Sequence, residues 1–117
     1  MQENIKFSAT WQALHPPKDA PAKLLRQIES DEQALAVSIR ASGHKLAYVA
    51  ARIGKSEGYV SRLRKGERPI PDRLVQALCD VTGTNLLRQY RDLCAALSDT
   101  SERREVDRLA AMLREAA

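Results

Sequence analysis

The chain has 117 residues, enough for one domain that buries a modest core without disulfides or metal ions. Its 44% hydrophobic content excludes a disordered chain, and its 4% aromatic content favours a small helical domain over a β-sandwich. The net charge of +4 is unevenly placed: residues 40–68 carry eight Lys or Arg and two Glu, a sum of +6, whereas the other residues sum to −2. A concentrated basic patch of this kind is typical of nucleic-acid binding.

The sequence predicts neither a metal site nor a membrane segment. Cys79 and Cys94 fall beside apolar residues of predicted helices, and no Cys-x-x-Cys spacing is present. The N-terminus has no apolar run of signal-peptide length, and no stretch approaches the roughly 18 apolar residues of a membrane span. No Ser/His/Asp set or phosphate-binding glycine loop is apparent either. We therefore expect a cytoplasmic protein that is not an enzyme and uses no cofactor.

Residues 1–20 are predicted to form an N-terminal arm. The alternation of Ile5, Phe7, Ala9 and Trp11 with polar residues favours a strand, whereas the spacing of Phe7, Trp11 and Leu14 favours a helical turn. Both alternatives stay open. Three prolines between residues 16 and 21 then interrupt regular structure, which predicts a linker between this arm and the body.

Residues 21–97 are predicted to form the helical body. A first helical pattern runs over residues 21–42 and ends at Gly43; Ser30, followed by Gln33, resembles a capping box, so a break near Ser30 stays open. Two short helices follow over residues 45–53 and 56–65, and Gly54 supplies the turn between them.

The remaining elements follow a loop over residues 66–71. Asp72 is expected to cap a fourth helix that ends at Gly83, and residues 86–97 are expected to form a fifth. Residues 98–101 offer new caps, and residues 102–116 are expected to form a separate amphipathic helix. We therefore assign residues 98–117 to a C-terminal element that could form a dimer.

The stretch between residues 46 and 66, LAYVAARIGKSEGYVSRLRKG, reads as a helix-turn-helix. Residues 35–87 resemble the lambda-repressor-like (Cro and XRE type) DNA-binding family. The matching features stand at fixed spacing: Val49-Ala50, Ile53-Gly54, Ser56, Val60-Ser61, Leu63 and Lys65-Gly66-Glu67-Arg68-Pro69. One position departs, because Leu46 stands where the family often has the Gln that braces a phosphate contact and a base-reading side chain.

The resemblance implies an all-α, lambda-repressor-like bundle of about five to six short helices with a central helix-turn-helix. It also implies that the start of the helix over residues 56–65 reads DNA bases in the major groove. By position, the base-reading residues would be Ser56, Glu57, Gly58, Ser61 and Arg62. The residues that contact the DNA backbone would be Lys45, Tyr59, Arg64, Lys65 and Arg68.

The function expected from this pattern is that of a sequence-specific transcriptional regulator that binds double-stranded DNA. The resemblance implies a repressor that occupies its operator as a homodimer, with the C-terminal helices as the expected contact. Two alternatives stay open: the DNA-binding antitoxin of a toxin–antitoxin pair, with a toxin as protein partner, and a protein-interaction module that keeps the fold without binding DNA.

Overall fold

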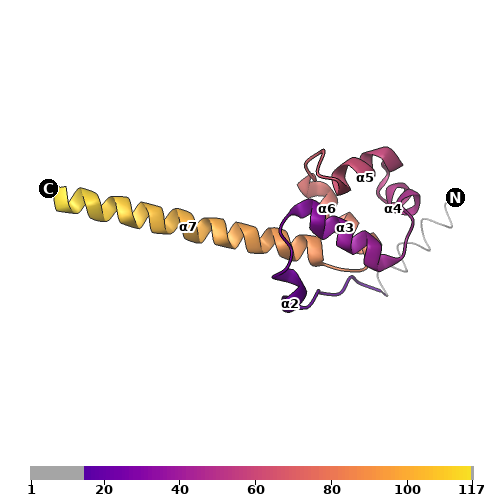
Figure 1. The fold of residues 1–117 in the computed structure, drawn as a ribbon, viewed down its shortest axis with the longest axis horizontal. Coiled ribbons are helices and arrows are strands. Elements are labelled where there is room, and N and C mark those ends of the chain that lie inside the picture. Colours follow the sequence, from indigo (N-terminus) through magenta and orange to yellow (C-terminus); the bar gives the residue numbers. More distant parts are fainter. Residues whose placement is uncertain (1–14, 117) are drawn as a thin grey trace.

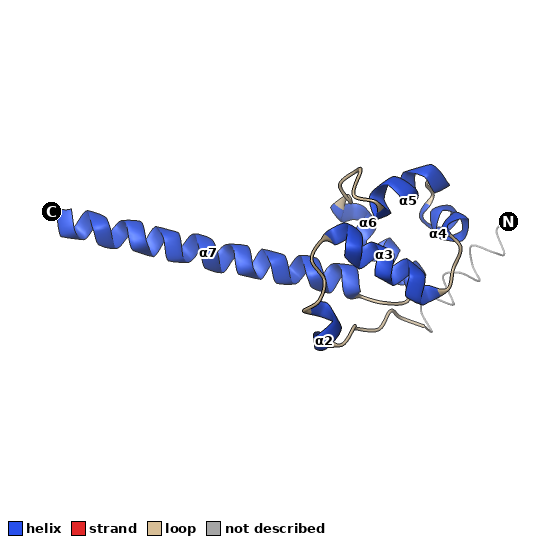
Figure 2. Ribbon diagram, viewed as in Figure 1, coloured by secondary structure: helices blue, strands red, loops and turns tan. Residues whose placement is uncertain are grey.

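The computed structural model describes residues 15–116, and within that range it is helical with no strands (Figures 1 and 2). This confirms the expected all-α fold for the described residues. The expected strand or helical turn over residues 5–14 lies outside the described residues. The helices, in chain order, are α2 (Ala22–Leu25), α3 (Asp31–Ser42), α4 (Leu46–Ile53), α5 (Glu57–Arg64), α6 (Asp72–Thr82) and α7 (Leu86–Ala116).

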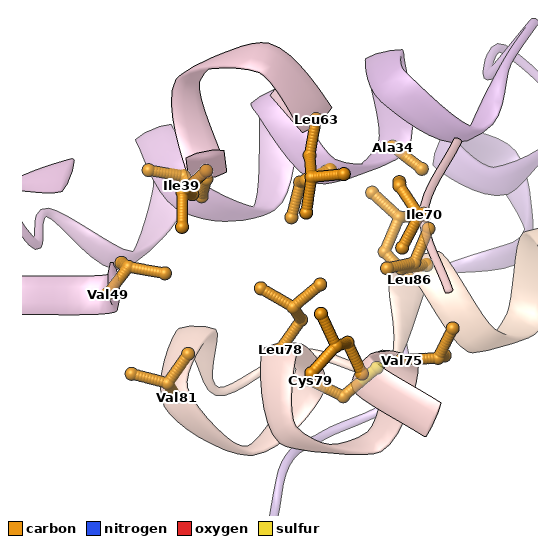
Figure 3. Close-up of a cluster of buried hydrophobic side chains, with 14 of the residues drawn as sticks. Ala34, Ile39, Val49, Leu63, Ile70, Val75, Leu78, Cys79, Val81 and Leu86 are labelled. Carbon is orange, nitrogen blue, oxygen red and sulfur yellow. The ribbon is translucent and has the colours of Figure 1, made fainter. Parts of the chain in front are cut away.

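The helices α3 to α6 and the start of α7 enclose one hydrophobic core (Figure 3). Leu35 of α3, Leu63 of α5, Leu78 of α6 and Leu86 of α7 are at most 1% exposed. These side chains come from four helices, so each helix buries one apolar face and leaves the opposite face to solvent. None of the described helices is both long and apolar enough to cross a lipid bilayer.

The break near Ser30, left open by the sequence, is present. The Ser30 hydroxyl accepts a hydrogen bond from the backbone N–H of Gln33 at 3.2 Å, and the Gln33 side chain accepts one from the N–H of Glu29 at 2.6 Å. This reciprocal capping satisfies N–H groups that have no partner within α3. Gly43 ends α3 in the left-handed conformation, as expected.

Two expected helix boundaries are wrong. Asp72 does not cap α6: Pro71 occupies the capping position and makes no side-chain cap, while Asp72 is the first helical residue. Residues 98–101 do not separate two helices, because α7 runs without a break over 31 residues. Within this stretch the Thr100 hydroxyl donates to the carbonyl of Ala96 at 2.9 Å. Thr100 therefore bonds to the preceding turn of α7 and does not cap a new helix.

Residues 17–20 lie against the junction of α6 and α7. The N–H of Lys18 donates to the carbonyl of Gly83 at 3.0 Å, and the N–H of Asn85 donates to the carbonyl of Lys18 at 2.8 Å. The Gln89 side chain makes two hydrogen bonds with the backbone of Ala20, at 2.8 and 3.2 Å. This segment therefore follows a fixed course along the body.

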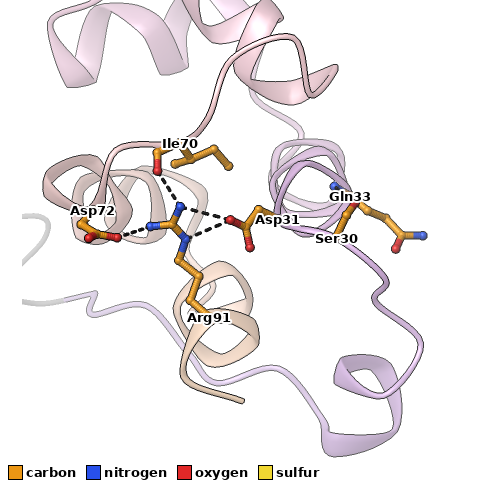
Figure 4. Close-up of polar contacts among 6 residues, drawn as sticks. All are labelled: Ser30, Asp31, Gln33, Ile70, Asp72 and Arg91. Atoms are coloured by element: carbon orange, nitrogen blue, oxygen red, sulfur yellow. Dashed lines mark hydrogen bonds and ion pairs between the residues drawn. The ribbon is translucent and has the colours of Figure 1, made fainter. Parts of the chain in front are cut away.

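Arg91 links the first turns of α7 to the rest of the domain by hydrogen bonds and ion pairs (Figure 4). Its Nε and Nη2 donate to one carboxylate oxygen of Asp31 at 3.2 and 3.1 Å, while Nη1 pairs with Asp72 and Nη2 also donates to the carbonyl of Ile70. One guanidinium thus joins α7 to α3, to α6 and to the loop that follows α5. This contact fixes the direction in which α7 leaves the domain.

Beyond its first turns α7 projects from the domain as a single rod (Figure 1). From residue 94 to residue 116 every side chain is exposed except the half-buried Ala111. At 1.5 Å per residue this segment is about 35 Å long. The molecule therefore consists of a globular helical domain and a long helix that the described residues leave uncovered.

Candidate nucleic-acid interface

The turn between α4 and α5 has the geometry that the sequence predicts. Gly54 adopts φ 72°, a left-handed conformation that glycine reaches without a steric penalty. The N–H of Gly54 donates to the carbonyl of Ala51, and the N–H of Lys55 donates to the carbonyl of Ala50 at 2.9 Å. These bonds satisfy the last carbonyls of α4 and send the chain sharply into α5.

Close packing between α4 and α5 fixes which face of α5 is outward. Val49 and Ala50 of α4 and Val60 and Leu63 of α5 are at most 2% exposed. Figure 3 shows Val49 and Leu63 pointing into the common core. Because these apolar residues occupy the inner face of α5, its polar side chains lie on the opposite, outer face.

The start of α5 is capped as expected. The Ser56 hydroxyl accepts a hydrogen bond from the N–H of Tyr59 at 3.1 Å, and Glu57 is the acidic residue of the first turn. Ser56, Glu57 and Gly58 are all exposed. A capped helix N-terminus with further N–H groups facing solvent also favours a nearby negative charge, such as a phosphate.

Arg62 lies along the outer face of α5 toward this N-terminus. A Cβ placed on Gly58 would stand 3.8 and 3.9 Å from the two terminal nitrogens of the Arg62 guanidinium. These are ordinary van der Waals distances, so the guanidinium lies beside Gly58, over the first turn of α5. Of the five predicted base-reading residues, four are exposed and Ser61 is half-buried, and all lie on the first two turns of α5 or at its cap.

The predicted backbone-contact residues flank this face. Tyr59 is half-buried against the core, with the Lys55 ammonium 5.3 Å and the Arg68 guanidinium 5.7 Å from the centre of its ring. Both distances are in the range of cation–π contacts. Lys55 was not among the residues predicted from the sequence, although it stands four residues before Tyr59 and its charge belongs to the same patch.

A second group of basic residues surrounds a shallow hollow of about 590 Å³ at the far end of α5. Arg64 and Lys65, both predicted to contact the DNA backbone, line it together with Arg40 of α3 and His44 in the turn between α3 and α4. Neither Arg40 nor His44 was predicted from the sequence to contact DNA, since neither belongs to α4 or α5. Leu46 forms part of the same wall and packs against the core, so this position offers no polar side chain.

The exposed face of α4 carries a row of stacked side chains. The rings of His44 and Tyr48 have their centres 4.5 Å apart, and the Arg52 guanidinium lies 5.6 Å from the centre of the Tyr48 ring. Tyr48 is 43% exposed. Lys45, the remaining predicted backbone contact, is exposed at the N-terminal end of this helix. The aromatic rings thus hold positive charge at the edge of the outer surface.

Comparison with known proteins agrees with this geometry. A family model described as helix-turn-helix matches residues 38–89, which span the end of α3 to the start of α7. No curated protein and no solved structure matches the chain. The matched segment contains both helices of the motif, its turn and every predicted base-reading and backbone-contact residue.

Proposed function

We propose that the chain is a sequence-specific transcriptional regulator that reads double-stranded DNA with α5, because residues 38–89 match a helix-turn-helix family model. The observation that carries this proposal is the outer face of α5: a capped N-terminus, a glycine and an arginine whose guanidinium lies beside that glycine, with basic side chains on both sides. Regulation of transcription places such a protein in the cytoplasm and requires no enzymatic activity.

The base-reading residues follow from what each side chain offers to a base edge. Arg62 presents the paired donors that match the O6 and N7 acceptors of guanine. Glu57 accepts a hydrogen bond from the N4 amino group of cytosine, while Ser56 and Ser61 donate or accept. Gly58 has no side chain and allows the backbone of α5 to lie close to the groove floor.

The backbone contacts follow from charge and position. Lys45, Tyr59, Arg64, Lys65 and Arg68 surround the reading face and would neutralise or donate to phosphates on either side of the groove. These contacts fix the orientation of α5 and carry no sequence information of their own. Binding should therefore weaken steeply as the salt concentration rises.

We further propose that the regulator is a repressor that acts as a homodimer on an inverted repeat. A single short recognition helix reads only a few base pairs, so one domain offers limited specificity. Two domains related by a two-fold axis double the number of base pairs read. A dimer bound over a promoter would then exclude RNA polymerase.

Selection of the full chain against a random duplex pool at physiological salt tests the proposal. The expected result is an enriched inverted repeat whose half-sites stand a whole number of helical turns apart. A folded chain that enriches no sequence would overturn the proposal and favour a protein-interaction module. Co-purification of a small protein bound stably to the chain would instead favour the antitoxin alternative.

Two substitutions separate the two kinds of contact on the selected site. Arg62→Ala should cost about 1–3 kcal/mol and relax the preference at one base pair. Lys65→Ala should weaken binding to every duplex and lower the salt slope by about one. An equal loss on all sequences for Arg62→Ala would remove that residue from the reading set.

A further inference from the structure

The distal part of α7 carries an apolar stripe that the described part of the chain leaves uncovered. Val106 is 63% exposed, Leu109 53%, Met112 58% and Leu113 74%. At 100° per residue, these four side chains fall within about 120° of one another around the helix. Val106, Leu109, Leu113 and Ala116 follow the alternating three- and four-residue spacing of a helix-pairing seam.

This stripe does not continue the face of α7 that packs on the domain. That face contains Leu86, Tyr90 and Leu93, and Leu97 follows it at the same spacing. Val106 stands nine positions after Leu97, which is two and a half helical turns, so the two faces point in opposite directions. Because the stripe lies on the opposite side of α7 from the face that packs on the domain, a straight α7 cannot bring the stripe onto its own domain.

A helix of this length needs a partner for its apolar face. In folded proteins the stability of a helix comes mostly from packing of that face, and isolated helices are marginal in water. Residues 98–116 carry five acidic side chains and four arginines, a sum of −1. The stripe region is thus close to neutral, which allows close approach of an identical helix without net repulsion and disfavours nucleic acid as the occupant.

We propose that this stripe is the interface with a second copy of the chain, and that the two α7 helices run antiparallel with Val106 opposite Leu109 of the other copy. The inference rests on the homodimer of the proposed function and adds the residues that form it and the direction of the helices. Orientation follows from the charges that flank the seam.

A parallel pairing in register places like charges together. Glu102 lies on the line of the seam, one helical turn before Val106, so a parallel pair would bring the two Glu102 carboxylates face to face. The antiparallel register separates them and brings opposite charges within reach of each other: Glu105 lies near Arg108 of the other copy, and Asp99 lies near its Arg114. Each of these pairs occurs twice by symmetry.

The antiparallel register also sets the separation of the two domains. Residue 93, where α7 leaves the domain, would lie about 44 Å from residue 93 of the other copy along the helix axis, at 1.5 Å per residue. Figure 1 shows α5 on the far side of the domain from the projecting helix, so the two reading helices are farther apart still. One turn of DNA is about 34–36 Å, so the half-sites should stand two turns apart.

Sedimentation equilibrium of the full chain without DNA tests the interface. The wild-type chain should form dimers, and Leu109→Gln, which keeps a good helix former, should raise the dissociation constant at least about tenfold. Leu97→Gln is the matched control, because Leu97 is equally apolar and 61% exposed on the opposite face. Its dissociation constant should not change. A monomeric wild-type chain, or equal effects of both substitutions, would overturn the interface.

A spin-label distance tests the orientation. In a Cys94→Ser background, a label on Ala96→Cys should give a distance of about 35 Å or more between copies in the antiparallel dimer. A parallel dimer would give less than about 20 Å, since paired helices lie 8–10 Å apart, and would overturn the orientation. Duplex binding is measured separately. A dimer that binds no duplex refutes the proposed function alone, whereas a monomer that reads a half-site refutes this interface alone.

Discussion

Replacement of Arg91 by alanine tests whether its guanidinium holds α7 to the domain. The side chain of Arg91 is 22% exposed and that of its partner Asp31 is 36% exposed, so solvent screens this ion pair only in part. Exposed pairs contribute about 0.2–1 kcal/mol, and removal of one partner of a buried pair costs about 3–5 kcal/mol. The substitution also removes a donor to the carbonyl of Ile70, which belongs to a residue only 4% exposed. We therefore expect Arg91→Ala to lower the free energy of unfolding by roughly 2 kcal/mol, a value between these two limits.

Urea and thermal unfolding followed by circular dichroism, at one fixed protein concentration, measures this loss. For a domain of this size it corresponds to a fall in Tm on the order of 10 °C. Asp31→Asn should be coupled to Arg91→Ala in a double-mutant cycle, whereas Asp72→Asn should change little because Asp72 is fully exposed. Arg88→Ala is the matched control on the same helix, since Arg88 makes one exposed hydrogen bond to Gln76.

Two outcomes would refute this reasoning. A change below about 0.5 kcal/mol for Arg91→Ala would show that solvent screens the pair as it screens an ordinary surface contact. Additive losses for Asp31→Asn and Arg91→Ala would show that the two side chains do not interact in solution.

Two further predictions concern the reading face and the thiols. Gly58→Ala should raise the free energy of unfolding by about 0.5–1 kcal/mol, because alanine favours the helical backbone over glycine and the new methyl group meets the Arg62 guanidinium without a clash. The same substitution should weaken binding to the selected duplex, and unchanged affinity would remove Gly58 from the interface. Burial raises the pKa of the Cys79 thiol, whereas Cys94 is exposed, so a thiol reagent at neutral pH should modify one cysteine per folded chain and the second only in denaturant. Cys94→Ser should abolish the fast reaction, and two fast thiols would contradict the packing of α6.

The motif and its surroundings could be predicted because they depend on local chemistry. Gly54 in the turn, Ser56 at the cap and Gly83 after α6 act through their own backbone or through neighbours three or four residues away. The buried positions of Val60 and Leu63 follow from helical spacing alone. The sequence was therefore sufficient for the all-α fold, the order of the helices and the outward face of α5.

The features that the sequence analysis missed depend on distant residues or on competing local signals. Arg91 pairs with Asp31, which is 60 positions away, and Lys18 bonds to Gly83 across a similar separation. No spacing rule relates such positions. Residues 98–101 were expected to cap a new helix because Ser and Asp favour caps, but exposed Ser and Asp also remain helical where the chain on both sides is helical.

Because α7 is unbroken, the number of residues between Arg91 and Val106 determines where the stripe points relative to α5. One inserted or deleted residue would turn the stripe by about 100° and shift it by about 1.5 Å. A change of seven residues, close to two full turns, would return it to within about 20° of its present direction. The exposed segment between Leu93 and Val106 is thus free to vary in composition while its length is constrained, and a change of seven or eleven residues would keep the direction of the stripe within about 20°.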